Sequence, residues 1–294
     1  MSTLKKLFRK GAEEQSTPGH SQRVGDHVLF DLTTNNDRGI DIVFVHGLRG
    51  HPIETWSKDG VCWPRDLLKK DAQEASLEVR SITWGYDADI ASISTEVSQE
   101  SIFGHAETLL GDLSRLRKDK KWPIIFVGHS LGGLIIKQAL IKSVSYLKHG
   151  RHSMRSEIYA HTKGVIFLGT PHRGSSQEGL GKVLLKLAIF RQSNEQLLRA
   201  LRDDSHILEE QRDNFITISK DMPVVCFYEE IPIPGLGLIV PKESAVYDGF
   251  SVSQVGISAN HMDMVKFDCI KDVGYQRILG EIIQISQNPD AQGK

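Results

Sequence analysis

Residues 123–134 read PIIFVGHSLGGL, a short apolar run followed by a serine between two glycines. The apolar run is typical of a buried strand, and Gly128-His129-Ser130-Leu131-Gly132 matches the G-x-S-x-G nucleophile elbow. In such a turn a strand passes into a helix so tightly that the serine is strained and its neighbours must be small. The following helix aims free N–H groups at the same point, which suits a developing oxyanion. The stretch therefore predicts that Ser130 is a nucleophile.

Apolar runs alternate with amphipathic segments around this motif, which is typical of an α/β protein. Near-continuous apolar strands indicate a mostly parallel, doubly wound sheet buried on both faces. Besides the elbow strand and its helix, the pattern predicts strands at 28–30, 40–45, 77–84, 164–169 and 224–228, and helices at 100–117 and 275–285.

The domain organisation predicted from these patterns has three parts. Residues 1–22 are expected to form a flexible basic tail, with peripheral contact to an anionic membrane as the functional alternative. Residues 23–290 are expected to form one α/β domain. Within it, residues 175–220 are too long for a simple crossover and carry an apolar stripe, so they predict a helical cap over the carboxyl ends of the strands. Two plain helices packed on the sheet are the alternative.

Composition excludes several classes of protein. The formal net charge of −1 gives no electrostatic argument for a nucleic-acid partner. Cys62, Cys226 and Cys269 lie far apart and predict neither a disulfide framework nor a metal site. The loose spacing of the histidines likewise predicts no metal ligands. Without a secretory signal, we expect an intracellular protein.

A nucleophilic serine needs a base and an acid that orients the base, and after an elbow these follow in the order acid, then histidine. His261 is the last histidine and directly precedes the closing helix, so we predict that it is the base. The acid is expected at the end of strand 224–228, where Glu229 and Glu230 both qualify. Adjacent side chains on a strand point to opposite sides, so only one of them can face the histidine. Asp248 is a third candidate.

The oxyanion hole is expected to use two backbone amides, those of Leu131 and Leu48. Leu48 lies in the loop after strand 40–45, where Gly47 permits a close backbone approach. We place Gly47, His46 and His129 at the substrate side of the site. His46 is expected to act as a structural hydrogen-bond partner and not as a base.

Several short motifs occur in one order along the chain: VHGLRG at 45–50, CWPRDLL at 62–68, GHSLGGL at 128–134, FLGTPHRGS at 167–175, VPKESA at 240–245 and NHM at 260–262. Together they span roughly residues 39–267 and resemble the serine active site-containing protein family. These serine esterases are α/β-hydrolases related to lipases and to the glycosylphosphatidylinositol inositol-deacylases. The resemblance implies the α/β-hydrolase fold and assigns the acid to Glu229. Relatives often join this domain to longer chains, so we expect a free-standing enzyme or an excised domain.

These observations together predict a serine hydrolase that cleaves carboxylic esters, lipid or other acyl esters, through an acyl-enzyme and without a metal or organic cofactor. The apolar loop at 231–237 follows the acid and favours an acyl substrate. One alternative is a hydrolase-fold module that binds or signals without turnover, and another is a thioesterase or peptidase with the same residues. By resemblance, we expect the protein in the cytoplasm or peripherally on a mitochondrial or endoplasmic reticulum membrane.

Overall fold

The structure is a computed structural model that describes residues 23–34, 39–88, 97–118, 120–150, 154–173, 182–183, 185–187 and 205–288. The predicted tail at 1–22 lies outside the described residues. Most of the predicted cap at 175–220 does so as well, apart from two short segments and the helix α7 (Ser205–Ile218).

A seven-stranded sheet crosses the described part of the chain, in the order β1-β5-β2-β6-β7-β8-β9. Only β1 runs antiparallel to its neighbour, so the sheet is mostly parallel, as predicted. Its strands are β1 (Gly25–Asp31), β2 (Ile40–Val45), β5 (Val79–Gly85), β6 (Ile124–His129), β7 (Thr162–Leu168), β8 (Val224–Glu229) and β9 (Val252–Ile257).

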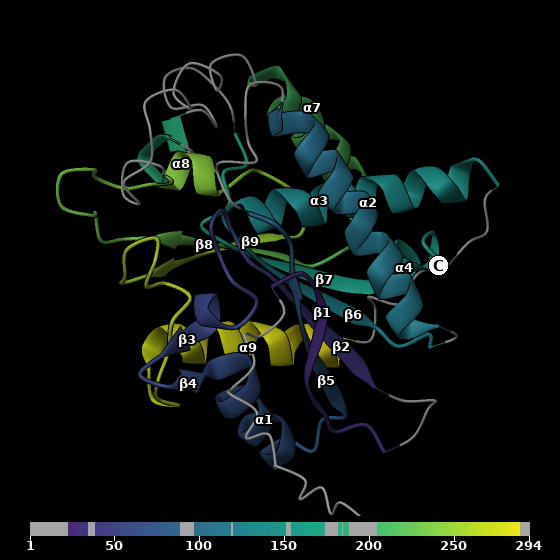
Figure 1. Cartoon of the computed structure of the whole chain (residues 1–294), viewed down its shortest axis with the longest axis horizontal. Helices are drawn as coiled ribbons and strands as arrows, with labels where there is room; N and C mark the ends of the chain where they lie inside the picture. The colour runs from purple at the N-terminus through teal and green to yellow at the C-terminus, as the bar shows by residue number, and fades with distance from the viewer. Residues whose placement is uncertain are drawn as a thin grey trace, which may run out of the picture.

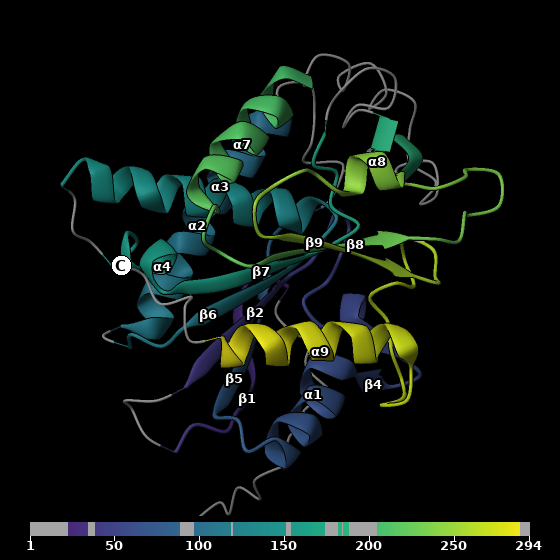
Figure 2. The ribbon, with the colours of Figure 1, turned by 180° about the vertical axis from the view of Figure 1, so that it is seen from behind.

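Helices cover both faces of this sheet, which gives the three-layer architecture of a doubly wound fold (Figures 1 and 2). On one face lie α1 (Trp63–Glu74) and α9 (Val273–Gln287), and on the other lie α2 (Val97–Arg117), α3 (Leu131–Lys148) and α7. The shorter elements are η1 (Glu54–Trp56), the hairpin β3 (Ser57–Lys58) and β4 (Val61–Cys62), α4 (Glu157–Ala160) and α8 (Lys242–Ala245).

Each face of the sheet has its own hydrophobic core, because the central strands present apolar side chains on both sides. Under α1 and α9 the core is aromatic: the Trp63 ring lies 5.1 Å from Phe44 and 5.8 Å from Tyr275, in edge-to-face geometry. The Trp63 indole also donates a hydrogen bond of 2.8 Å to the Val265 carbonyl. This bond fastens the segment that follows His261 to the first helix.

The described part of the predicted cap region packs on the domain core. Gln211 of α7 donates to the Leu134 carbonyl of α3 and to the Gln138 side chain, each at 3.2 Å. Phe215, one turn further along α7, is fully buried and lies 5.7 Å from the Phe167 ring of β7. Helix α7 therefore lies against α3 on the sheet face.

A buried ion cluster lies at the other end of the strands. Asp41 of β2 is fully buried and pairs with Arg80 of β5, whose Nε lies 2.7 Å from Oδ1. The Arg117 guanidinium at the end of α2 pairs with the second carboxylate oxygen. One carboxylate thus joins two strands and a helix far from the carboxyl ends of the strands.

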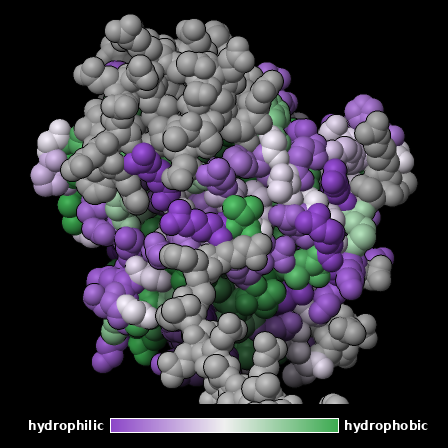
Figure 3. All heavy atoms as spheres, in the orientation of Figure 1, coloured by the Kyte–Doolittle hydropathy of each residue, from purple (hydrophilic) through white to green (hydrophobic). Residues whose placement is uncertain are grey.

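The surface described by the structure is largely polar. Hydrophilic side chains cover much of the coloured surface on the face drawn in Figure 3. None of the described helices combines the length and the apolar composition that a membrane span requires. All three cysteines are free, with Cys62 and Cys226 buried and Cys269 exposed.

Candidate active site

Ser130 stands at the turn between β6 and α3 with a strained backbone, φ 51° and ψ −123°. A positive φ is rare for a residue with a side chain and is typical of a functional site. The Ser130 amide donates to the Leu168 carbonyl of β7 at 2.9 Å, and its carbonyl accepts from Gly133. A Cβ at Gly132 would lie 2.3 Å from the His46 carbonyl oxygen, so the second elbow glycine is required by close packing. The predicted elbow is therefore present.

The loop after β2 reaches Ser130 through Gly47. A Cβ at Gly47 would lie 2.8 Å from the Ser130 Cβ, so no larger residue fits between the loop and the elbow. The Gly47 carbonyl accepts from the Gly50 amide at 3.0 Å and from the His46 Nδ1–H at 2.9 Å. Because C=O and N–H of one trans peptide point in opposite directions, these bonds aim the Leu48 amide away from them. No described backbone or side-chain acceptor binds that amide.

His46 lies beneath this loop and is fully buried. Its Nε2 accepts from the Tyr86 amide at 3.3 Å, and its ring stacks on the Tyr86 ring at 4.5 Å. Burial lowers the pKa of His46 to about 4, so the neutral ring with the proton on Nδ1 dominates at neutral pH. His46 does not line the pocket described below.

His261 lies beside the elbow, on the loop between β9 and α9. A Cβ on Gly169, the residue after Leu168, would lie 2.9 Å from the His261 Cε1 atom. Within the elbow itself, the His129 Nε2–H donates to the His261 carbonyl at 3.0 Å. The His261 side chain is fully buried, and neither its Nε2 nor the Ser130 Oγ has a hydrogen-bond partner among the described residues. The two atoms are therefore not hydrogen-bonded to each other in this structure.

Of the three acid candidates, Glu229 is the one that the fold brings to His261. Its Oε1 lies 3.4 Å from the His261 Nδ1, and both side chains are fully shielded from solvent. The same oxygen accepts from the Val240 amide at 2.6 Å, which fixes the carboxylate. Glu230 is exposed and lies against Gly256 of β9, and Asp248 is exposed and pairs with Arg173.

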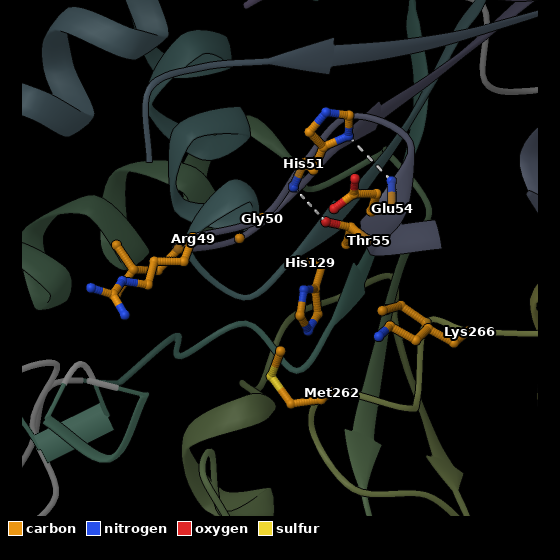
Figure 4. Close-up of a pocket in the computed structure, with 11 residues that line it drawn as sticks. Arg49, Gly50, His51, Glu54, Thr55, His129, Met262 and Lys266 are labelled. Atoms are coloured by element: carbon orange, nitrogen blue, oxygen red, sulfur yellow. Dashed lines mark hydrogen bonds between the residues drawn. The ribbon is translucent and has the colours of Figure 1, made fainter. Parts of the chain in front are cut away.

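A pocket of about 140 Å³ lies beside this group of residues. Gly47, Leu48, His129 and Met262 line it on the side of the elbow and the His261 loop. Figure 4 shows His129 between the loop that carries Gly50 and Thr55 and the side chain of Met262, with Lys266 on another side. Burial lowers the pKa of His129 well below its usual value, so its ring is neutral. Gly47 and His129 thus both line this pocket.

Three features of the site were not anticipated from the sequence. They are the tie from His129 to the His261 carbonyl, the Val240 amide on Glu229, and the close approach of Gly169 to the base. The first and third join segments 132 and 92 positions apart, and the second spans a loop of 11 positions, so local patterns carry no signal for any of them. Among the described residues, no three His, Cys, Asp or Glu side chains gather as metal ligands would.

A doubly wound sheet with a strained serine at the end of a central strand defines an α/β-hydrolase of the lipase and esterase type. The chain belongs to the family described as putative serine esterase (DUF676), whose model matches residues 41–201. This match agrees with the family resemblance inferred from the motifs.

Curated relatives agree with this assignment. The chain is 27% identical over 273 residues to Protein SERAC1 of Danio rerio, covering 84% of this chain and 39% of the relative. It is 26% identical to Protein SERAC1 of Homo sapiens, covering 90% and 42%. The chain thus spans about two fifths of the length of these relatives.

Two solved structures show the same fold at low identity. Est1E from Butyrivibrio proteoclasticus matches with a TM-score of 0.52 and 15% identity, covering 90% of this chain and 94% of that chain. The Bacillus licheniformis lipase BlEst2 in its propeptide form matches with a TM-score of 0.55 and 16% identity, covering 92% and 55%.

Proposed function

We propose that this chain is a serine esterase that hydrolyses carboxylic esters, lipid or other acyl esters, through Ser130, His261 and Glu229. One observation carries the proposal: the strained, buried Ser130 stands in an elbow whose His129 binds the His261 carbonyl, and His261 lies 3.4 Å from a carboxylate fixed by a backbone amide. A hydroxyl at its ordinary pKa is a weak nucleophile, and such a histidine and carboxylate are what activate it.

In the acylation step, Ser130 Oγ attacks the ester carbonyl while His261 Nε2 takes the hydroxyl proton. Glu229 holds the imidazole with its proton on Nδ1 and stabilises the imidazolium that forms. His261 then passes its proton to the alkoxide leaving group, the C–O bond breaks, and an acyl-serine remains. In deacylation, water attacks this ester with His261 again as base, releasing the acid and restoring the serine.

The Leu48 and Leu131 amides stabilise the tetrahedral oxyanion of both steps. Leu131 is the first residue of α3, where helical N–H groups have no intrahelical partner. The Leu48 amide is held in place by the two bonds to the Gly47 carbonyl. Donors fixed before the reaction stabilise developing charge without reorganisation, and each is worth about 10²- to 10³-fold in rate.

The pocket lies beside the loop after β2 that carries Gly47 and Leu48, which we call the oxyanion loop. Its size favours a substrate with a compact group on one side of the ester. Its volume of about 140 Å³ would hold roughly four to five water-sized groups. Leu48, Met262 and Val265 give it apolar walls, while Lys266 and Thr55 provide polar ones. We assign this pocket to a small part of the substrate next to the scissile bond.

Fluorophosphonate labelling of the wild-type protein and of Ser130→Ala tests the proposal directly. We expect stoichiometric labelling of the wild type and none of the variant, because the reagent forms a bond only with an activated serine. Ser145→Ala, which changes an exposed serine of the same helix α3, is the matched control and should label like the wild type. Absence of labelling in the wild type, or equal labelling of Ser130→Ala, would contradict an esterase role.

Hydrolysis of p-nitrophenyl esters, acyl thioesters and acyl anilides of graded acyl length then identifies the class of leaving group. The proposal predicts that esters are cleaved with the highest kcat/KM and that Ser130→Ala lowers this value by about 10⁴-fold or more. Faster turnover of thioesters or anilides would assign the same residues to a thioesterase or a peptidase.

A further inference from the structure

Lys137 of α3 lies in the interior of the domain, although lysine is usually a charged surface residue. It is not one of the residues proposed to carry catalysis. Its side chain is fully buried, and its Nζ has no hydrogen-bond partner among the described residues. The Nζ lies 5.7 Å from the centroid of the Phe215 ring of α7 and 5.6 Å from that of Tyr247, which follows α8. The two aromatic rings give an ammonium group partial stabilisation, and the Tyr247 hydroxyl, also buried, is not hydrogen-bonded to it in this structure.

His172, in the segment that follows β7, is a second buried group without a full set of partners. It is fully buried, and its ring lies 4.9 Å from the Tyr247 ring that also contacts Lys137. Its Nε2 lies 3.6 Å from the Cys226 Sγ, whereas its Nδ1 has no partner among the described residues. Two side chains thus lie against one ring, each with a nitrogen that no described residue binds.

None of the described charged groups that influence the Lys137 amine is a carboxylate. The thiol of Cys226 on β8 favours the charged amine, and the guanidinium of Arg212 on α7 disfavours it. A buried ammonium without an acceptor is strongly unfavourable, so interior lysines are normally paired. A partner that keeps this amine in its charged form must accept hydrogen bonds and carry a negative charge.

We propose that Lys137 and His172 form a buried binding site for a small monovalent anion such as chloride. The anion accepts from the Lys137 ammonium and from a proton on His172 Nδ1, which the ring carries when Nε2 accepts from the Cys226 thiol. Such a site joins α3, α7 and the segment after β7. Lys137 follows Ser130 by seven residues, about 10 Å along the helix axis, so the site is separate from the proposed catalytic serine.

Binding of an anion to this site is expected to depend on pH. Burial lowers the pKa of Lys137 to about 7, so without a bound anion the amine is largely neutral above that pH. The other titratable or charged groups that face it are Arg212, His172, Cys226 and Tyr247, from α7, the segment after β7, β8 and the segment after α8. Because the anion prefers the ammonium form, its affinity should fall about tenfold per pH unit above 7.

Bromide soaking of wild-type crystals tests the site without any variant. We expect an anomalous bromide peak within hydrogen-bonding reach of Lys137 Nζ. Absence of a peak there, with density for water only, would overturn the proposal. Peaks confined to surface lysines would do the same.

Thermal unfolding in sodium chloride and in sodium gluconate of equal ionic strength tests it in solution at pH 7. We expect the wild-type Tm to rise by about 3 °C at tenfold saturation with chloride. Lys137→Met should abolish this response, and Lys148→Met, which changes an exposed lysine of the same helix, should retain it. An equal chloride response in Lys137→Met would contradict the assignment. Neither result depends on esterase activity.

Discussion

The Glu229 Oε1 lies 3.4 Å from the His261 Nδ1, although 32 positions of the chain separate the two residues. The first ends β8 and the second follows β9, and the parallel pairing of these two strands brings their carboxyl ends together. A carboxylate with no solvent contact and a fixed amide donor holds one orientation. That geometry distinguishes Glu229 from its exposed neighbour Glu230. The same substitution at the two positions therefore tests the role of Glu229.

Glu229→Gln is expected to lower kcat by about 10²- to 10⁴-fold, because a neutral amide no longer stabilises the imidazolium. Its oxygen still accepts from the Val240 amide, so the fold should be retained. Glu230→Gln is the matched control and should change kcat by less than about twofold. Steady-state ester hydrolysis with circular dichroism melts measures both. An equal loss in the two variants would exclude Glu229 as the orienting acid.

Gly47→Ala is expected to abolish most activity while leaving the domain folded. The added Cβ would lie 2.8 Å from the Ser130 Cβ and would displace the oxyanion loop or the serine. We expect a loss of about 100-fold in kcat/KM, comparable to removal of one oxyanion donor. Gly280→Ala on α9, where an added Cβ meets nothing within 4 Å, serves as the control. Wild-type activity in Gly47→Ala would refute this placement of the loop.

His46→Asn is expected to change the pH dependence of stability. The pKa of the buried His46 falls from 6.5 to about 4, so the unfolded chain binds the additional proton between these values. The wild type should therefore lose about 1.4 kcal/mol per pH unit as the pH falls from 6.5 towards 4. The His46→Asn variant lacks this titration. The difference between its free energy of unfolding and that of the wild type should therefore become smaller as the pH falls from 6.5 towards 4.

Urea unfolding at pH 7, 6 and 5 measures the difference between the His46→Asn variant and the wild type. His149→Asn replaces an exposed histidine and controls for removal of any imidazole. A deficit that stays constant across this range would mean that His46 does not titrate as its burial implies.

Asp41→Asn is expected to destabilise the fold by about 3–5 kcal/mol, because it leaves Arg80 and Arg117 buried without a counter-charge. Asp213→Asn removes a pairing with Arg212 on the surface of α7 and should cost less than about 1 kcal/mol. Denaturant unfolding monitored by tryptophan fluorescence compares the two. Similar small losses would indicate that the arginines find other partners or solvent.

Much of the fold was predictable because the central strands are buried on both faces and therefore read as unbroken apolar runs. The predicted strands at 40–45, 77–84 and 224–228 correspond to β2, β5 and β8 within one to two residues. The edge strand β9 was not predicted as an element. Its Ser253 and Gln254 are exposed and weaken the apolar pattern.

The site was predictable where a motif fixes the local backbone, as at Ser130. It was less predictable where the choice among several candidate residues for one role depends on tertiary packing. The local sequence pattern did not decide which of Glu229, Glu230 and Asp248 faces His261, since all three follow apolar runs. Their positions in the fold depend on the pairing of β8 with β9 and on the Val240 amide. The role of His46 as a buried support similarly requires Tyr86, a residue 40 positions away.

The tie between His129 and His261 has a consequence for how the protein acquires its function. It joins residues 132 positions apart, and Gly132 packs on the carbonyl of His46 from a third segment. Closing a loop of this length costs more entropy than pairing β2 with β6, whose partners lie 83 positions apart, so we expect the tie to form after the sheet. Partly refolded species with a native-like sheet would therefore be silent in an activity assay. Recovery of turnover after dilution from denaturant would report completion of folding, later than the return of circular dichroism.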